Sequence, residues 1–554
     1  MKNIYPNKKN PLIVMIITLT IAMTAVQGCG IPAIWSSNVA DSGQPSVEIV
    51  EENVPLTEGV SMSAEPVQAL QRADFKLRYD SESSLNPITG LNSANILLSS
   101  LLYEPLFTLG SGFTAVPVIC ESWSIDEDDE MKHTYVIKPD IAMHDGSSLT
   151  ADDVAYTLNQ ARQKGRYINR FDNVSSIASD GELTVTIVLK SYNSRFNRLL
   201  DIPIIKEGSM DSNVPSGTGP YVLSGVGNKR LERFVQYREF SNLSIPVIFL
   251  LECNDSEVME LFDDGEISLL WDDPSGTAAL RLNSLFESRY FDTTTLQFIG
   301  FNARKAAIRD ADVRRAIGCA VNRELITTTI IPGQSLAAPL AISPAYANYS
   351  SDWENSSVDP LVEMSALLSR AGMIDSDGDP FLEYPDYSGN YNPLTIDFIV
   401  NAENTYKVAA SNKIAETLRL SGIDIAVREL PWVQFVAALE TGDFDMYYGE
   451  AALGADFDFS SLILPKGSLN YGNTGSIDYI PYLGDFLSAR TTIGEAEAAR
   501  LLCNEILYNA PFIPILYKKY AVYTPIGLLV SASPNQSGVF TNVADWDVKL
   551  TKVP

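Results

Sequence analysis

The chain has 554 residues, with 69 acidic and 40 basic side chains and a formal net charge of −29 at pH 7. Because so acidic a surface repels a polyanion, the charge argues against nucleic acid as a partner. Hydrophobic residues make up 45% and charged residues 20%, which is typical of a globular protein, and the length allows roughly two or three domains.

The amino-terminal residues have the pattern of a targeting segment. Three lysines stand among the first nine residues, and the apolar run over residues 12–26 is too short to span a membrane comfortably. The run closes on Val26-Gln27-Gly28-Cys29, which resembles a bacterial lipobox, where the cysteine is diacylated and becomes the new amino terminus. We expect residues 1–28 to be a lipoprotein signal peptide and Cys29 to be lipidated; a plain secretory signal or an uncleaved anchor is the alternative.

A flexible acidic tether is predicted next, over residues 29–72. Between residues 30 and 71 there is no Lys or Arg, while acidic residues accumulate among Ser, Pro and Val. This composition is typical of a segment without a packed core. About 40 such residues reach roughly 35 Å root-mean-square, enough to hold a folded body off a membrane.

Strands and helices alternate through the rest of the chain. Thr150 with Asp153 three residues later predicts a helix cap, and Asp359-Pro360 predicts a second helix start. Helices interleaved with strands imply mixed or parallel sheets with covered faces, an α/β fold. The periodicity predicts strands at 75–79, 133–138, 183–189 and 423–427, and helices at 360–371, 409–420 and just before Gly442.

Catalytic and cofactor motifs are lacking in the sequence. His133 and His144 are the only histidines, and neither has a metal-ligand partner at i+4. The chain has no Gly-x-Ser-x-Gly elbow and no phosphate-binding glycine loop. Four further cysteines are too widely spaced for a metal cluster and predict no particular pairing. We predict that the protein is not an enzyme and that it binds no cofactor and no metal. An extracytoplasmic hydrolase is a remote alternative.

One acidic loop leaves two interpretations open. A calcium-binding loop has acidic residues spaced like those of Asp375-Ser376-Asp377-Gly378-Asp379. In this chain, however, Pro380 occupies the position at which such a loop needs its glycine. A calcium site and an exposed turn are the alternatives, and we predict the turn.

A series of motifs in order carries a family resemblance. It begins with Tyr103-Glu104-Pro105 and the turn and helix over 144–154, and it continues through Gly217-Thr218-Gly219-Pro220-Tyr221. Further motifs are Phe301-Asn302, 312–317, 320–324, 367–372, 442–445 and 510–514. Together they resemble the family 5 extracellular solute-binding proteins, the peptide-, nickel- and opine-binding receptors of ABC importers. The segment after Tyr237 is shorter than the family pattern.

The resemblance implies the topology of the fold. It implies two lobes of the periplasmic-binding-protein kind (type II, cluster C), with a subdomain inserted in the first lobe. The implied boundaries are 73–295 for lobe I, about 92–213 for its inserted subdomain, 296–504 for lobe II, and 505–554 for a return to lobe I. Ligand would bind between the lobes and be enclosed by hinge closure.

The stretch from Gly442 to Ser460 is the best candidate for the ligand site. A short strand is followed by small residues over 449–455 and then by Asp456. Such a loop lets a ligand approach the backbone closely, and a lone acid suits a ligand ammonium; an ordinary loop with a solvated aspartate is the alternative. Residues 449–456 resemble the segment where peptide receptors hold the α-ammonium of their ligand. The predicted ligand contacts are Asp456, Gly454, Leu453, Ala452, Trp271, Asn302 and Tyr517, of which Trp271 has a plain core residue as its alternative.

The resemblance also implies partners and location. We expect a peptide ligand, ABC transporter permease subunits as partners, and a monomer held by its lipid at the outer face of the cell membrane or in the periplasm. A non-peptide solute (an opine, a sugar or a metal chelate) is the alternative ligand.

Overall fold

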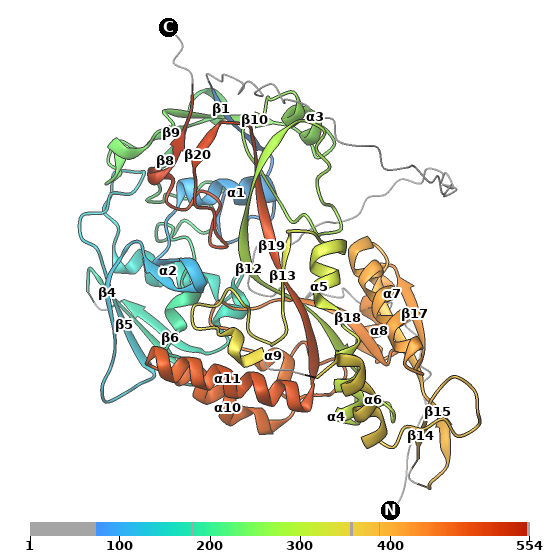
Figure 1. Cartoon of the computed structure of the whole chain (residues 1–554). Coiled ribbons are helices and arrows are strands. Elements are labelled where there is room, and N and C mark those ends of the chain that lie inside the picture. Colours follow the sequence, from blue (N-terminus) through green and yellow to red (C-terminus); the bar gives the residue numbers. More distant parts are fainter. Residues whose placement is uncertain (1–73, 180, 355–357, 387, 551–554) are drawn as a thin grey trace, which may run out of the picture.

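The computed structural model describes residues 74–179, 181–354, 358–386 and 388–550. The predictions for the signal peptide, the tether and Cys29 lie outside these residues. The described chain forms two lobes joined by two long strands, β12 (Phe286–Phe301) and β19 (Phe512–Pro525), which run side by side through the middle of the molecule (Figure 1). The predicted two-lobed α/β fold is confirmed.

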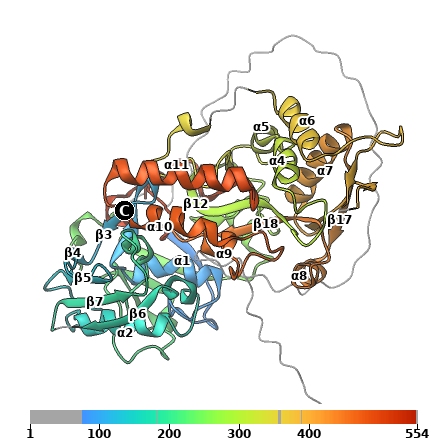
Figure 2. The same ribbon diagram turned by 90° about the horizontal axis from the view of Figure 1, so that it is seen from below.

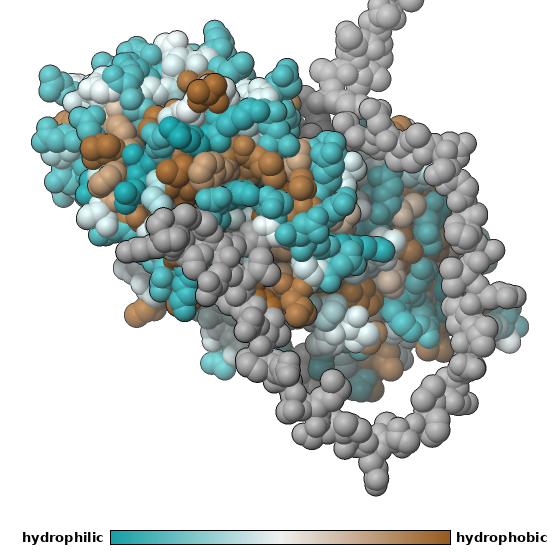
Figure 3. Space-filling view, turned by 90° about the horizontal axis from the view of Figure 1, so that it is seen from above, coloured by the Kyte–Doolittle hydropathy of each residue, from teal (hydrophilic) through white to brown (hydrophobic). Residues whose placement is uncertain are grey.

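The first lobe is built on a mixed four-stranded sheet in the order β1-β10-β9-β8. Its edge strand β1 buries alternate side chains, as predicted, and α1 packs against β1 and β8. The end of the molecule that carries these strands is largely hydrophilic, with a band of apolar residues across it (Figure 3). The elements are β1 (Phe75–Tyr79), α1 (Ser93–Leu102), β8 (Tyr221–Ser224), β9 (Arg230–Arg233) and β10 (Val247–Glu252).

A second, antiparallel sheet lies in the middle of the first lobe's sequence, in the order β4-β5-β7-β6. Helix α2 packs against β6 and β7, and it begins with the predicted capping box between Thr150 and Asp153. This sheet is the inserted subdomain of the fold. Its elements are β4 (Cys120–Ile125), β5 (Lys132–Ile137), α2 (Ala151–Ala161), β6 (Val174–Ser179) and β7 (Thr184–Leu189).

The seven-stranded sheet connects the lobes. Strands β12 and β19 pair along most of their length, with a register shift between Asp292 and Leu296. The predicted lobe boundary falls at this shift, and the boundaries remain a proposal. The strand order is β11 (Leu270–Asp272), β19, β12, β18 (Met446–Ala452), β16 (Thr395–Asn401) and β17 (Asp424–Leu430), with β13 (Ser335–Ala337) beside β19.

Capping residues set the ends of several helices in the second lobe. Asp359 accepts from the backbone of the first turn of α6, and Gly442 ends α8 with a φ of 73°, both as predicted. Helix α7 begins earlier than predicted because Asn404 caps it. The helices are α4 (Ala311–Cys319), α6 (Pro360–Arg370), α7 (Thr405–Leu420), α8 (Trp432–Thr441), α10 (Ile480–Ser488) and α11 (Thr492–Asn509). The short elements are β2 (Phe107–Leu109), β3 (Ala115–Pro117), α3 (Val258–Asp263), α5 (Arg323–Leu325), β14 (Glu383–Pro385), β15 (Tyr391–Pro393), α9 (Ser460–Ile463), β20 (Leu529–Ser531) and β21 (Asp547–Val548).

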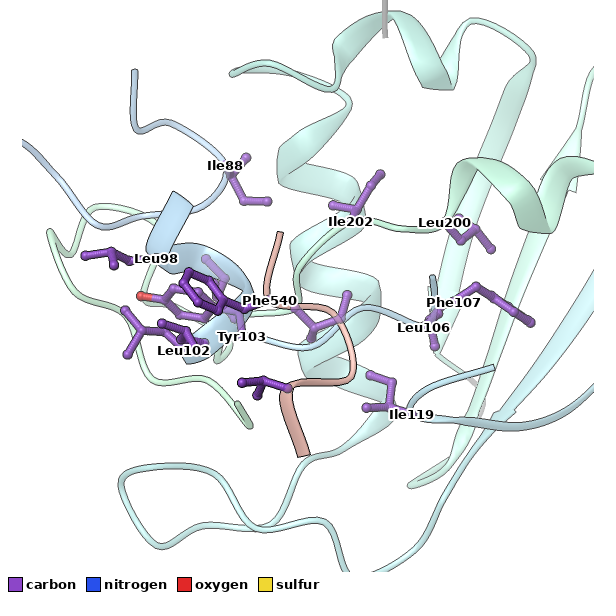
Figure 4. Close-up of a cluster of buried hydrophobic side chains, with 14 of the residues drawn as sticks. Ile88, Leu98, Leu102, Tyr103, Leu106, Phe107, Ile119, Leu200, Ile202 and Phe540 are labelled. Carbon is purple, nitrogen blue, oxygen red and sulfur yellow. The ribbon is translucent and has the colours of Figure 1, made fainter. Parts of the chain in front are cut away.

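One hydrophobic core ties the first lobe together from segments far apart in sequence. Leu102 at the end of α1, Ile202 after β7 and Phe540 near the carboxyl terminus are buried in the same cluster (Figure 4). Burying such side chains contributes roughly 1.5–3 kcal/mol each. Within the described residues, every helix is too short or too polar to serve as a membrane span.

Candidate ligand-binding site between the lobes

The loop that follows β18 is fixed by backbone contacts to the strand β12. The backbone N–H of Leu453 donates to Thr294 O at 3.1 Å, and the Thr294 hydroxyl donates to Leu453 O at 2.6 Å. At Gly454, a Cβ would lie 2.4 Å from Asp456 Oδ1, so any other residue would displace the carboxylate. The loop therefore holds Asp456 at a defined place at the end of the sheet.

Asp456 is buried between the lobes. Its side chain belongs to the second lobe, and the residue is 3% exposed. Asn193 of the first lobe donates through Nδ2 to Asp456 Oδ2 at 2.8 Å, while its own Oδ1 accepts from the Arg195 backbone N–H at 3.0 Å. Among the described residues, the other carboxylate oxygen, Oδ1, accepts only one long hydrogen bond, from the backbone N–H of Asp458 at 3.5 Å. That oxygen retains capacity to accept a hydrogen bond from a ligand.

The segment containing Asn193 also binds the carboxyl end of α10. The Ser194 backbone N–H donates to Leu487 O at 2.9 Å and its hydroxyl to Ala489 O at 2.8 Å. The Arg195 guanidinium donates to Phe486 O and lies 3.8 Å from the centroid of that ring. Carbonyls at the end of a helix lack partners within the helix, so the first lobe supplies them. Figure 2 shows α10 and α11 extending toward the inserted subdomain.

The charges around Asp456 do not balance. Arg195 and Arg198 are cationic and contact Glu495, at 3.2 and 2.9 Å. Glu495 balances one of these two positive charges and Asp456 balances the other. The carboxylate of Asp458 is then left without a matching cation in this cluster. Burial and the nearby Asp456 carboxylate raise the pKa of Asp458 above its usual range. A positively charged ligand group beside these two acids would restore balance.

Trp271 lies on β11, at one edge of the strand order of this sheet. It is half-buried on β11 and tilts against Tyr520, with ring centroids 5.9 Å apart. Both rings line a pocket of about 140 Å³ that also includes Leu91 and Asp272. Burial raises the pKa of Asp272 to about 6. β11 and β18 are three strand spacings apart across the sheet, roughly 14 Å. Trp271 is level with Arg289 of β12 whereas Ala452 is level with Thr295, so Trp271 and the Asp456 loop are also offset along the strands.

A buried ion network joins the lobes on this side. Lys518 on β19 is 1% exposed, donates to Asp273 of the first lobe, and lies 3.3 Å from Glu450 on β18. Lys407 of α7 is 3.0 Å from the same carboxylate. Burial alone would raise the pKa of Glu450, but Lys407 and Lys518 hold it well below its usual range. Asn404 completes the contact by donating to Ser275 O at 3.0 Å.

Two of the predicted ligand contacts have their polar groups hydrogen-bonded within the protein. Asn302 is 1% exposed, and its side-chain amide donates to Gly442 O and Phe444 O, both at 3.0 Å. Tyr517 is 1% exposed within the core of the second lobe, and its hydroxyl donates to Ala341 O at 2.5 Å. These hydrogen bonds give both residues a structural role in the fold, and their contact with a ligand stays a prediction.

The remaining predicted residues are close together in the loop. Ala452 and Gly454 are half-buried, whereas Leu453 is 3% exposed and packs in the core of the second lobe. Sequence reasoning missed Asn193 and Lys518. A lysine inside the apolar run Phe512–Tyr523 is a signal that a buried anion is nearby, but nothing local marked Asn193.

The acidic loop of the second lobe brings three carboxylates together. Oxygen atoms of Asp375, Asp377 and Glu383 lie within 4.8 Å of one another, and the two aspartates are exposed. They are far in sequence from the candidate site and contact none of its residues described above. The turn Asp375–Gly378 is closed by a hydrogen bond from the Gly378 backbone to Asp375 at 2.7 Å, as an exposed turn requires.

Comparisons with known proteins agree on one family. Residues 114–473 match a family model described as bacterial extracellular solute-binding proteins, family 5. The chain is 23% identical to the oligopeptide-binding protein AppA of Bacillus subtilis over 431 residues, covering 70% of this chain and 75% of that protein. It is 21% identical to the nickel-binding periplasmic protein of Escherichia coli over 447 residues, covering 76% and 84%. The solved structure of Bacillus subtilis AppA in complex with a nonapeptide superposes with a TM-score of 0.60 at 19% identity, over 87% of this chain and all of that one.

Proposed function

Because this chain belongs to the bacterial extracellular solute-binding proteins of family 5, the solute-capturing components of ABC importers, we propose that its solute is a peptide with a free amino terminus. The peptide binds between the two lobes and is delivered to the membrane permease of the importer. The similarity to an oligopeptide-binding protein supports this choice, and the similarity to a nickel-binding protein makes a metal chelate the main alternative.

The surroundings of Asp456 carry the proposal. Among the described residues its Oδ1 accepts only a long hydrogen bond, from Asp458 at 3.5 Å, and the residue is shielded from water. The three acids Asp456, Asp458 and Glu495 also outnumber the two arginines of the cluster. A hydrogen bond to a charged group contributes roughly 1.5–3 kcal/mol, and leaving a buried charge unpaired costs a similar amount or more. Two histidines, the ligands that a nickel site would favour, lie elsewhere: His144 binds Gly219 O at 3.0 Å, and His133 is buried in β5.

The test is a thermodynamic cycle with Asp456→Asn. The new amide keeps an acceptor for Asn193, so the local fold is preserved while the negative charge is lost. Calorimetry with a peptide and its N-acetylated twin should show the free peptide weakened at least roughly tenfold by the substitution, since ~1.4 kcal/mol is a factor of ten. The acetylated peptide should bind the wild type poorly and respond little to the substitution.

A matched control is Asp443→Asn, on the rim of the second lobe. Its side chain is 66% exposed and pairs with Arg428 at 3.0 Å, and such surface pairs contribute about 1 kcal/mol or less. This variant should bind both peptides like the wild type. Equal affinity of the wild type for free and acetylated peptide would remove Asp456 from this role and favour a non-peptide solute.

Attachment to the membrane is proposed through Cys29. The amino-terminal pattern supports a diacylated cysteine, and two acyl chains give stable anchoring whereas one gives only marginal binding. Cys29→Ala should abolish labelling by palmitate, and a variant that is still labelled would contradict the assignment. We also propose that the protein is an extracytoplasmic monomer, that its partner is the permease, and that it has no catalytic role. The lobe boundaries given above are part of the same proposal.

A further inference from the structure

The pocket beside β11 is built by parts of the first lobe that are far apart in sequence. Its volume is about 140 Å³, and its wall is formed by the start of α1, the helix α3, the strand β11 and the residues 276–280. Tyr520 contributes to the wall from β19. The pocket is offset from the Asp456 loop both across and along the central sheet.

Two aromatic rings form part of the wall. Trp271 is half-buried and Tyr520 is 8% exposed, and their rings are inclined at 39° to each other. The face of an aromatic ring carries partial negative charge and attracts a cation that lies over it. Leu97 and Leu280 add aliphatic surface to the same wall. This lining suits an aliphatic chain that ends in a positive charge.

The buried acid of the pocket retains capacity to accept hydrogen bonds. Asp272 is 9% exposed, and its Oδ2 accepts from the Leu280 backbone N–H at 2.9 Å. The adjacent backbone N–H of Asp273 also stabilises this carboxylate. A carboxylate has about four acceptor sites, so about two remain. Neither oxygen of Asp272 is among the unpaired side-chain atoms of the described residues that are sealed from solvent, so a molecule in the pocket can reach the group.

The charges of the wall leave Asp272 without a cation among the described residues. Arg78 is paired with Asp255, and Lys518 is paired with Asp273, so the other two acids of the wall are neutralised. Burial raises the pKa of Asp272 to about 6, which means that its charged form destabilises the fold at neutral pH. Perturbed acids of this kind are concentrated at functional sites, where a ligand can supply the missing positive charge.

We propose, on the basis of the peptide function proposed above, that this pocket takes a basic side chain of the bound peptide. The ammonium of a lysine or the guanidinium of an arginine binds the Asp272 carboxylate, and the aliphatic stem lies against Trp271. A cavity of about 150 Å³ holds a six-membered carbon ring, and either side chain has about as many heavy atoms. The ligand thereby provides the counter-ion that the first lobe lacks.

The test compares alanine-based nonapeptides that carry a single lysine with twins that carry norleucine at the same position. Both side chains have the same aliphatic stem, so the pair differs in the ammonium. The position is moved along the peptide, and calorimetry at neutral pH measures each pair. At the position that reaches the pocket, the wild type should prefer lysine about ten- to hundredfold. Asp272→Asn should abolish the preference and leave the affinity for the norleucine peptide unchanged.

A loss of folding cannot produce this result. Asp272→Asn removes a buried charge that has no counter-ion, so the variant should be at least as stable as the wild type at neutral pH. The matched control is Glu260→Gln, which removes one negative charge from an exposed position on α3 of the same lobe and should keep the preference for lysine. Equal affinity of the wild type for both twins at every position, or an equal loss of preference in the two variants, would overturn the proposal.

A second measurement distinguishes a failure of this proposal from a failure of the peptide function. n-Butylamine and n-butanol reproduce the lysine side chain with and without its charge, and saturation-transfer NMR with the full chain detects their binding. The wild type should prefer the amine at least about tenfold, and Asp272→Asn should not discriminate. Preference for the amine without preference for lysine peptides would overturn the peptide side chain as occupant and leave a free amine. Peptides that bind through Asp456 with no preference for lysine or for the amine would overturn the pocket and keep the peptide function.

Discussion

Removing the buried lysine between the lobes tests whether the ion network stabilises the fold. Lys518→Met keeps most of the side-chain volume but strands Asp273, whose only ion-pair partner among the described residues is Lys518. Breaking a buried pair from one side costs about 3–5 kcal/mol. The roughly 470 described residues have an unfolding entropy of about 1 kcal/mol per degree, at ~2.1 cal/mol/K each. We therefore expect the melting temperature of Lys518→Met to lie about 3–5 °C below that of the wild type.

The adjacent residue provides the matched control. Lys519 is 26% exposed at its side chain and pairs with Asp292 at 3.5 Å, so Lys519→Met should cost less than about 1 kcal/mol. Scanning calorimetry of both variants gives the two melting temperatures to be compared. Lys518→Met combined with Asp273→Asn should recover part of the loss, because no carboxylate is then stranded. Equal melting temperatures of the two single variants would refute the reasoning.

Two further predictions concern the site. Asp272 has a folded-state pKa of about 6 through burial, above its usual value near 3.9; its contribution to stability is present below pH 4 and is lost as the pH rises to about 6. Asp272→Asn should therefore be more stable than the wild type by about 2–3 kcal/mol at pH 7.5 and equal to it near pH 4, and denaturant titrations that show a constant difference would contradict this. Asn302→Ala should cost about 1–3 kcal/mol of stability by leaving two carbonyls without their donor while ligand affinity is unchanged; an affinity loss with normal stability would return Asn302 to the ligand site.

Local signals in the sequence were sufficient for individual helix ends, whereas the two-lobed topology was predicted from the family resemblance. The capping box of Thr150 and Asp153 and the αL glycine at Gly442 depend on neighbouring residues only, and the structure has each of them. Contacts between the lobes depend on residues far apart in the chain. Asn193 meets Asp456 across 263 positions, a pairing that no local pattern encodes. The hydrogen bonds of Asn302 and Tyr517 inside the protein could not be predicted for the same reason, since their acceptors, Phe444 and Ala341, are 142 and 176 positions away.

The two polar interfaces between the lobes also bear on how the proposed closure works. One joins Asn193 to Asp456, and the other joins Asp273 to Glu450 of the second lobe through Lys518. Asn193, Asp456 and Lys518 are buried. In an open form water can solvate these groups, and in contact they satisfy one another. A half-closed form would exclude water before the pairs are made, which costs about 1–3 kcal/mol for each unsatisfied group. Closure should therefore occur in one step, and a ligand that completes the hydrogen bonding of Asp456 favours the closed form by its differential affinity for that state.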